Sequence, residues 1–225
     1  MTAGASLPER GAAAAELAEL AVQLGVALDS AQCDRLLRFG ELLQRWNRVH
    51  NLTAIETPSR ILSHHLLDSL AVAPVVEEQS RGRPLRVLDV GAGGGLPGIP
   101  LAIAMPQHHF TLIDKVGKKV AFLQQARVEL DLTNIEPVHS RVEDFDAPPF
   151  DLIVARAFSS LTDFVRSTRR LLAAAGTWCA MKGSVPVAEI RQLEQAGLGV
   201  RLARTVKLNV PRLHAERHLL LIESN

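Results

Sequence analysis

Residues 85–101 read LRVLDVGAGGGLPGIPL, and this stretch decides the fold. Apolar residues rich in Val and Leu lead to Asp89, four glycines follow between Gly91 and Gly95, and Pro97 opens a predicted helix. The pattern predicts a strand, a tight turn and a helix start. Glycines suit such a turn because it needs backbone angles that a Cβ would block, and because a ligand then approaches bare main chain. We therefore expect a nucleotide-like ligand at this turn.

The spacing of the glycines discriminates between nucleotide ligands. A dinucleotide fingerprint places glycine at the first, third and sixth positions, with a pyrophosphate on the helix N-terminus. Counting from Gly91, the third position is Gly93 but the sixth is Leu96, and Pro97 and Pro100 remove two N–H donors from the helix start. A site short of anion donors suits a ligand without phosphates. S-adenosylmethionine, an adenosine joined to an amino acid through a sulfonium, is such a ligand.

A second acidic residue supports a nucleotide site. Residues 109–114, HFTLID, predict a strand that ends in Asp114, 23 residues after Gly91. An acid at the tip of the second strand is the acceptor expected for ribose hydroxyls in a Rossmann-like site. The alternative is a glycine turn that only lets a helix pack on a strand, and Asp114 makes that alternative weaker.

Composition limits the class of protein. The 225 residues are 47% hydrophobic, enough for a sizeable core, and no apolar run reaches the ~18 residues of a membrane span. Cys33 and Cys179 are far apart in the sequence, so we expect a reducing cytosol and no zinc site, and no secretory signal is evident. The net charge of +1 argues weakly against a general RNA binder but not against a specific one.

Hydrophobic periodicity gives the order of the elements. We expect a flexible leader over 1–11, helices over 12–26 and 59–70, and between these two a helix capped by Ser30. Strand and helix patterns then alternate, with strands at 85–90, 109–114, 134–138, 150–155, 176–182, 200–207 and 217–223 and helices at 118–130, 161–172 and 187–195. This predicts an α/β fold of the class I, S-adenosylmethionine-dependent methyltransferase type. A Rossmann-like, seven-stranded, mostly parallel sheet would occupy 81–225, after an N-terminal helical extension over 1–80.

Several short phrases together resemble one family. They are WN at 46–47 with NLT at 51–53, HLLDS at 65–69, DVGAGGGLPGIPL at 89–101, SRVE at 140–143, RAF at 156–158, KG at 182–183 and ERHL at 216–219. In this order they resemble the glucose-inhibited division protein B family, also known as ribosomal small-subunit methyltransferase G. The resemblance covers roughly residues 28–223. It implies transfer of a methyl group from S-adenosylmethionine to N7 of one guanine in 16S rRNA of the small ribosomal subunit.

The resemblance also implies residues of the cofactor site. Gly91 and Leu96 are similar to glycine-loop contacts, and Gly93 belongs to the same turn. Val142 and Glu143 resemble the pair that meets the adenine, and Arg156 resembles a residue at the methionine end of the cofactor. The residue types fit these roles: Glu143 can accept from the adenine amine and Arg156 can pair with a carboxylate. An ion pair of Arg156 with Asp89 or Asp151 is the alternative.

The implied reaction needs no general base, because guanine N7 has an in-plane lone pair and carries no proton. Proximity and exclusion of water should then provide most of the rate enhancement. We expect Arg141, Lys182 and Arg217 to hold RNA phosphates or the guanine O6 edge. N7 lies in the deep, narrow groove of an RNA helix, so the target should be in a loop or flipped out. Phe158 either stacks on it or belongs to the core.

Other readings stay open at this stage. Three basic groups are RNA contacts or solvated helix faces: Arg35, Arg38, Arg45 and Arg48; Lys115, Lys118 and Lys119; and Arg166, Arg169 and Arg170. We expect no metal site at His64, His65 and Asp68, where a polar link between helix and main domain is favoured, or at His214, Glu216 and His218 along one strand.

Three other functions compete with a methyltransferase of ribosomal RNA. They are a methyltransferase of small molecules or proteins, a dehydrogenase, and a non-enzymatic RNA-binding or cell-division regulatory protein. We expect a cytoplasmic monomer that binds neither membrane nor metal. The sequence does not identify the guanine or say whether the substrate is the assembled subunit or an assembly intermediate.

Overall fold

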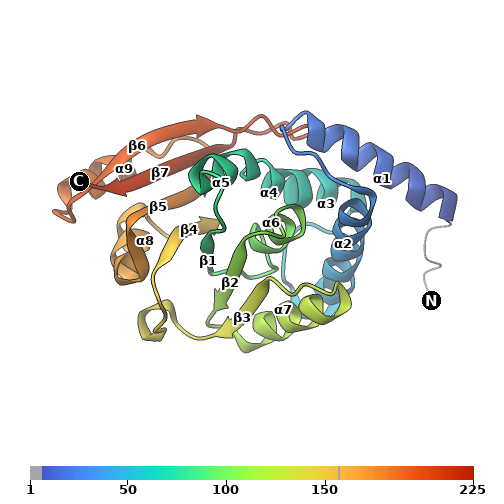
Figure 1. Cartoon of the computed structure of the whole chain (residues 1–225), viewed down its shortest axis with the longest axis horizontal. Coiled ribbons are helices and arrows are strands. Elements are labelled where there is room, and N and C mark those ends of the chain that lie inside the picture. Colours follow the sequence, from blue (N-terminus) through green and yellow to red (C-terminus); the bar gives the residue numbers. More distant parts are fainter. Residues whose placement is uncertain (1–6, 157) are drawn as a thin grey trace.

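One seven-stranded sheet forms the centre of the computed structural model, which describes residues 7–156 and 158–225 (Figure 1). The strands lie in the order β3-β2-β1-β4-β5-β7-β6. Their bounds are β1 Arg86–Val90, β2 His109–Asp114, β3 Ile135–His139, β4 Phe150–Arg156, β5 Leu172–Lys182, β6 Val200–Lys207 and β7 His218–Ser224. The pairs from β3 through β5 are parallel, and β7 is antiparallel to both β5 and β6. The predicted mostly parallel sheet with a final hairpin-like pair is confirmed.

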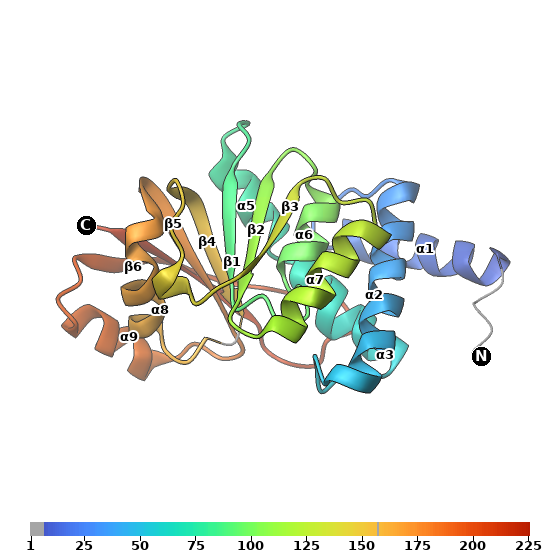
Figure 2. The same cartoon turned by 90° about the horizontal axis from the view of Figure 1, so that it is seen from below.

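Helices cover both faces of this sheet. They are α1 Leu7–Val22, α2 Ser30–His50, α3 Pro58–Ile61, the π-helix η1 Leu62–Leu67, α4 Asp68–Leu70, α5 Ala73–Ser80, α6 Gly98–Ala104, α7 Gly117–Glu129, the 3₁₀ turns η2 Val142–Asp144 and η3 Arg169–Leu171, α8 Leu161–Thr168 and α9 Val187–Gln195. Figure 2 shows α8 and α9 on one side of the sheet and α1, α2, α6 and α7 on the other.

Alternation along the strands produces the two layers of the core. Val87 and Leu152 belong to the hydrophobic cluster shared with the N-terminal helices, α6 and α7. Their neighbours Leu88 and Ile153 belong to the cluster formed with α8 and α9. Successive side chains of a strand point to opposite faces, so a strand buried on both faces becomes apolar throughout. This explains why the central strands β1, β2 and β4 are mostly apolar along their length.

The N-terminal helices differ from the expectation at their ends. Helix α1 begins at Leu7, so residues 7–11 are helical and not a leader, and residues 1–6 lie outside the described part of the chain. Pro8 is compatible with a first helical turn, where its missing N–H would be unpaired. The helix ends at Val22, before Val26, and a turn with Gly25 at φ +76° follows. Helix α2 is capped by Asp29, not Ser30, because Asp29 and Gln32 form a reciprocal capping box.

The helix expected over 59–70 is present as one continuous helical run from Pro58 to Leu70, in which the π-helical segment η1 lies between α3 and α4. Another helix boundary differs from the expectation. The helix expected to end at Leu172 stops as α8 at Thr168, whose hydroxyl donates to Phe164 O and accepts from Trp178 Nε1 at 2.8 Å. Strand β5 therefore begins at Leu172, earlier than expected. Within the described residues, no helix is both long and apolar enough to cross a membrane.

Candidate active site at the carboxyl ends of the strands

The glycine turn after β1 has backbone angles that only glycine adopts readily. Gly91, Gly93 and Gly95 have φ of +70°, +56° and +75°. The N–H groups of Gly91 and Ala92 both donate to Ile113 O of β2, at 2.9 and 3.1 Å. The turn is therefore fastened to the neighbouring strand. A Cβ at Gly91 would meet nothing within 4 Å, which leaves the space beside this residue free for a ligand.

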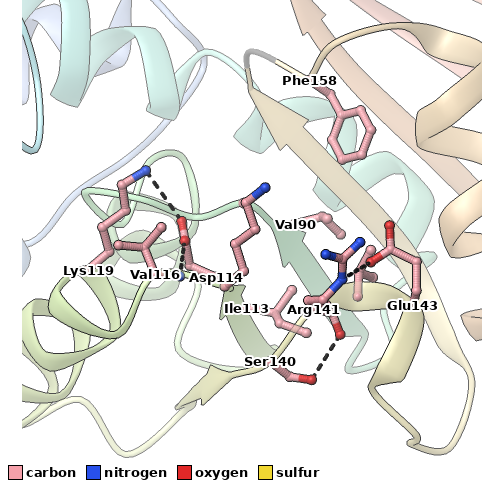
Figure 3. A pocket seen from close by; sticks show the side chains of 12 residues that line it. Val90, Ile113, Asp114, Val116, Lys119, Ser140, Arg141, Glu143 and Phe158 are labelled. Carbon is pink, nitrogen blue, oxygen red and sulfur yellow. Dashed lines mark hydrogen bonds and ion pairs between the residues drawn. The ribbon is translucent and has the colours of Figure 1, made fainter.

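A cavity of about 260 Å³ lies beside this turn (Figure 3). It is at the carboxyl ends of β1 and β2, where strand order reverses between β1 and β4, the usual ligand position in open α/β sheets. Among the predicted cofactor residues, Gly91, Asp114, Val142 and Glu143 line it. Other lining residues are Val90, Ile113, Lys115, Val116, Lys119, Ser140, Arg141 and Phe158.

Asp114 is buried, and its two carboxylate oxygens bind the main chain. Oδ2 accepts from Gly93 N–H at 3.0 Å and lies 3.7 Å from Lys119 Nζ, while Oδ1 accepts from Val116 N–H at 2.9 Å. Each carboxylate oxygen has a second lone pair, so the group can still accept from ribose hydroxyls. Gly93 does not line the cavity and is connected to it only through this bond to Asp114.

Glu143 and Arg141 lie on the segment after β3. Arg141 Nε is 3.6 Å from Glu143 Oε2, and both side chains are more than half exposed. Arg170 supports this segment from η3 by donating through Nη2 to Val142 O at 3.0 Å, to Glu143 O at 2.9 Å and to Phe145 O. Arg141, expected near RNA, is therefore at the rim of the predicted cofactor cavity. Arg170 was expected either to contact RNA or to lie on a solvated helix face. Its side chain instead binds the main chain of this segment.

Three predicted cofactor residues, Gly93, Leu96 and Arg156, are not among the residues that line this cavity. Leu96 is 4% exposed and packs in the core, so its side chain points into the protein and away from the cavity. Arg156 extends from the end of β4 into a neighbouring cavity, where its Nη1 is 3.5 Å from Asp68 Oδ2. The ion-pair partner of Arg156 is therefore Asp68, and the proposed partner Asp151 is paired with Arg83 at 2.8 Å.

Asp89 is the other buried acid near the turn. It is fully buried, and its Oδ2 accepts from Gly98 N–H at 2.9 Å. Burial raises the pKa of Asp89 to about 7, and the bond from Gly98 opposes this shift. Asp89 therefore joins the end of β1 to the start of α6 below the turn.

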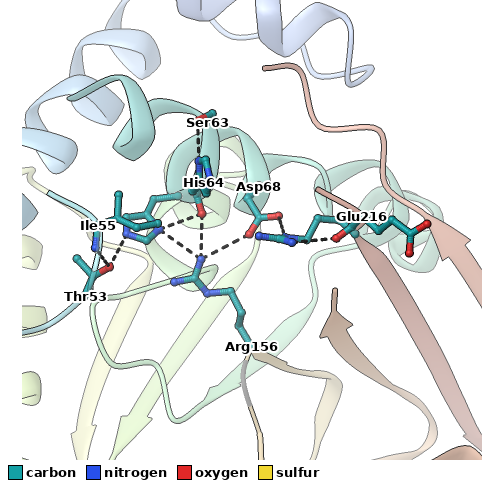
Figure 4. A network of polar contacts seen from close by, with 9 residues as sticks. Thr53, Ile55, Ser63, His64, Asp68, Arg156 and Glu216 are labelled. Carbon is teal, nitrogen blue, oxygen red and sulfur yellow. Dashed lines mark hydrogen bonds and ion pairs between the residues drawn. The ribbon is translucent and has the colours of Figure 1, made fainter. Parts of the chain in front are cut away.

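The neighbouring cavity, of about 430 Å³, contains three basic residues. Arg156, Lys182 and Arg217 line it together with Asp68, His64 and His65. Figure 4 shows the polar contacts of Asp68, His64 and Arg156 at this site. Lys182 Nζ is 2.9 Å from Glu189 Oε2 and 3.4 Å from the carbonyl of Phe158, which lines the first cavity. The two cavities are therefore neighbours, because a lining residue of one, Lys182, contacts a lining residue of the other, Phe158. Phe158 also packs against Phe164 at a ring distance of 5.3 Å, so it has a core contact and a cavity contact.

The chain matches a known family over most of its length. The family model described as rRNA small subunit methyltransferase G matches residues 32–220. The chain belongs to this family. Ribosomal RNA small subunit methyltransferase G of Enterobacter sp. (strain 638) is 46% identical over 211 residues, 93% of this chain and 98% of the relative. The enzyme of that name from Laribacter hongkongensis (strain HLHK9) is 50% identical over 198 residues, 88% of this chain and 91% of the relative.

Solved structures support the fold independently of the family. A SAM dependent methyltransferase from Aquifex aeolicus has a TM-score of 0.57 and 20% identity, and the match covers 76% of this chain and 96% of that one. The class I methyltransferase fold is thus confirmed. Membership in the rRNA small subunit methyltransferase G family confirms the expected family, a ribosomal RNA methyltransferase with S-adenosylmethionine as methyl donor.

The residues of the first cavity fit that donor. Val90, Ile113 and Val142 provide apolar walls, and Asp114 and Glu143 provide oxygen acceptors for hydroxyl and amine groups. The free space beside Gly91 lets a ligand approach the main chain. When bound, S-adenosylmethionine supplies the activated methyl group at its sulfonium.

The sequence analysis did not assign roles to several of the contacts that build the site. Lys119, beside Asp114, was named only within a basic cluster, and Asp68 only as a polar link. A usable signal for Asp68 was its place among Leu66, Leu67 and Leu70, since a carboxylate in an apolar helical run needs a buried partner. The expected link to the main domain is present. His214 and Glu216 precede β7, so they do not alternate with His218 along a strand.

Two of the four arginines of α2 have protein partners. Arg38 Nη2 donates to Glu129 O at 2.6 Å, and Arg45 Nη2 is 2.8 Å from the Glu129 carboxylate. These contacts join α2 to the end of α7. Arg38 and Arg45 therefore have a structural contact, which neither a solvated face nor an RNA contact predicts.

Proposed function

We propose that this protein transfers the methyl group of S-adenosylmethionine to N7 of one guanine in 16S rRNA of the small ribosomal subunit. The observation that carries the proposal is the pair of adjacent cavities, one with the features of a nucleoside site and one with three basic side chains. A methyl group passes directly between two ligands only if both are held next to each other in line. The atom N7 is inferred from the family resemblance, and the cavities are compatible with it.

The cofactor residues are part of this proposal. Gly91, Gly93, Asp114, Val142 and Glu143 would hold the nucleoside, and Leu96 would contribute through its main chain, since its side chain is in the core. Arg156 would reach the methionine end from the second cavity. Its place at the carboxyl end of β4, next to β1, supports that role.

Methyl transfer to N7 requires the protein to position the target base and to exclude water from the site. Guanine N7 attacks with its own lone pair, so no side chain has to remove a proton. Lys182 and Arg217 in the second cavity would hold phosphates or the O6 edge of the target, and Arg141 would contact RNA at the rim of the first. Phosphate contacts by such cations fix the register of the RNA. The methylated ring is cationic, so these side chains should lie beside N7 and not against it.

We propose the assembled small subunit as substrate and a cytoplasmic monomer as the enzyme. The net charge is only +1, and Lys182, Arg217 and Arg141 each have an acidic neighbour, so naked RNA would meet little unpaired positive charge at the site. Among the described residues, the exposed large hydrophobics Val22, Val49, Val128 and Val187 are on four different helices, which supports a monomer. We also propose residues 1–80 as a helical extension of the domain over 81–225.

The experiment is transfer of labelled methyl from S-adenosylmethionine to unmodified small subunits, with naked ribosomal RNA and DNA assayed in parallel. Nucleosides from the product are separated and identified. We expect label as 7-methylguanosine, mainly in the subunits. Label in another nucleoside would contradict the N7 assignment. Cofactor binding without label in any nucleic acid would favour a small-molecule or protein substrate.

A further inference from the structure

Asp68 is a buried carboxylate that contacts two arginines distant from it in sequence. It is the first residue of α4 and is 2% exposed. Its Oδ1 accepts from Arg217 Nε at 3.0 Å, and its Oδ2 is 3.5 Å from Arg156 Nη1 (Figure 4). One arginine ends β4 and the other immediately precedes β7. A single side chain of the N-terminal helices therefore fixes cations from two strands of the sheet.

Each guanidinium uses only part of its donors within the protein. Arg156 Nη1 also donates to His64 O at 3.2 Å, and Arg217 Nη1 donates to Glu216 O at 2.8 Å. Among residues 7–156 and 158–225, Nη2 of both arginines has no hydrogen-bond partner. Both side chains line the second cavity and are about one quarter exposed, at 26% and 24%. The unused donors are therefore available to acceptor atoms of a ligand.

A second set of contacts holds the same cavity wall. His65 Nε2 is 2.8 Å from Thr53 Oγ1, and Thr53 N–H donates to Asn47 Oδ1 at 2.7 Å. His65 Nδ1 is 2.9 Å from His64 O, and this carbonyl also accepts a hydrogen bond from Arg156 Nη1. These contacts connect the end of α2 to η1 and so to Arg156. π-Helical segments such as η1 occur frequently at functional sites.

Stability alone gives a poor reason for this arrangement. A buried ion pair contributes little net stability, because the desolvation of the charges opposes their attraction, and apolar residues of similar size serve the core as well. Asp68 is also the one carboxylate among the residues that line this cavity, next to three basic side chains. An anion between two cations sets the orientation of both and leaves the Nη2 donor of each guanidinium unused.

We propose that Asp68 is a positioning residue of the methyl-transfer reaction, which holds Arg217 in the orientation that receives the target guanosine and its phosphate. This inference rests on the proposed function. It makes the N-terminal helices part of the acceptor site. Asp68 acts through Arg217 and does not touch the reacting atoms.

The test compares Asp68→Asn with wild type in transfer of labelled methyl to unmodified small subunits. The variant keeps the shape of the side chain but loses its charge. We expect kcat/KM for subunits to fall about tenfold or more. The Kd of S-adenosylmethionine should stay within about twofold, because Arg156 keeps its hydrogen bond to His64 O. Asp151→Asn is the matched control, because Asp151 pairs with Arg83 at 2.8 Å, away from both cavities, and its kcat/KM should not change.

A double-mutant cycle separates positioning from general stability. If Asp68 acts through Arg217, Asp68→Asn should lower kcat/KM for subunits by a much smaller factor in an Arg217→Gln background than in wild type. Asp68→Glu keeps the carboxylate and should recover part of the activity. If Asp68→Asn does not fold, Asp68→Glu and Arg217→Gln with their double variant provide the same cycle.

Two results would overturn the inference. One is a folded Asp68→Asn enzyme that is as active as wild type. The other is a double variant whose loss of kcat/KM equals the product of the losses in the two single variants. Wild type that makes no 7-methylguanosine would instead contradict the proposed function, so the two failures are distinguishable.

Discussion

Asp114 Oδ2 accepts the main-chain N–H of Gly93 at 3.0 Å, so the acid at the end of β2 closes the glycine turn that follows β1. The residue that we expect to bind ribose therefore also shapes the loop beside the cofactor cavity. The carboxylate is 5% exposed and has Lys119 Nζ at 3.7 Å. Loss of this side chain should affect both the direct contact and the turn.

We predict that Asp114→Ala weakens S-adenosylmethionine binding by about 1–3 kcal/mol, the cost of leaving hydrogen-bonding partners unsatisfied. Titration calorimetry gives the Kd, and circular dichroism checks the fold. Asp144→Ala is the matched control, since Asp144 is an exposed aspartate outside the residues that line the cavity. Unchanged affinity in Asp114→Ala would refute its ribose role.

Arg170→Ala should weaken cofactor binding without removing any residue of the cavity. Its Nη2 donates to the carbonyls of Val142, Glu143 and Phe145, and so holds the segment expected to meet the adenine. We predict a loss of about 1 kcal/mol in binding, because the segment must be ordered again by the ligand. Arg166→Ala, which removes an arginine paired only with Asp163 on the same helix, is the control. Equal Kd values for the two variants would exclude the role of Arg170.

Gly98→Ala should destabilise the protein by about 1–3 kcal/mol through overpacking. A Cβ there would lie 2.1 Å from Leu112 Cδ2 and 2.6 Å from Asp89 Oδ2, and both neighbours are buried. Gly11→Ala is the matched control, because a Cβ at this position of α1 meets nothing within 4 Å. There the change should stabilise the helix by up to about 1 kcal/mol. Urea unfolding measures both, and shifts of the same sign would contradict the prediction.

The stability of the wild-type protein should fall as pH falls from about 6.5 towards 4 through His65. Burial, and then the charge of Arg156, lower the pKa of His65 from 6.5 to about 4. The unfolded chain therefore binds a proton more readily than the folded protein in this window, and acidification favours unfolding. Between about pH 7 and 5 the loss from His65 alone should be roughly 2 kcal/mol.

His65→Gln should remove that part of the pH dependence. Glutamine keeps a donor and an acceptor but does not titrate. Urea unfolding at several pH values gives the free energy of unfolding for both proteins. The difference between them should shrink as pH falls. A constant difference across the window would show that His65 is not the titrating group.

The sequence analysis predicted the sheet well because its signals are local. All seven strands lie within a few residues of the predicted ranges, since a doubly buried strand is an apolar run that ends at turn residues. The glycine turn and Asp114 were also predictable, because β1, β2 and their loops adjoin in sequence. Gly91, Asp114, Val142 and Glu143 do line one cavity. Their contacts with the cofactor remain predictions.

Only the tertiary structure decided which distant side chains meet. Asp68 and Arg217 are 149 residues apart and bind each other because β7 returns between β5 and β6 and brings Arg217 to the N-terminal helices. No local sequence pattern indicates that Asp68 meets Arg217 or Arg156. The ion-pair partner expected for Arg156 was therefore Asp89 or Asp151, as the alternative to the cofactor. The capping of α2 by Asp29, and not by the adjacent Ser30, depends on reciprocal bonds between Asp29 and Gln32. The sequence by itself thus determined the periodic elements, the glycine turn and the family, which depend on neighbouring residues. The tertiary structure determined the second cavity, because its charges come from segments that only the folded sheet brings together.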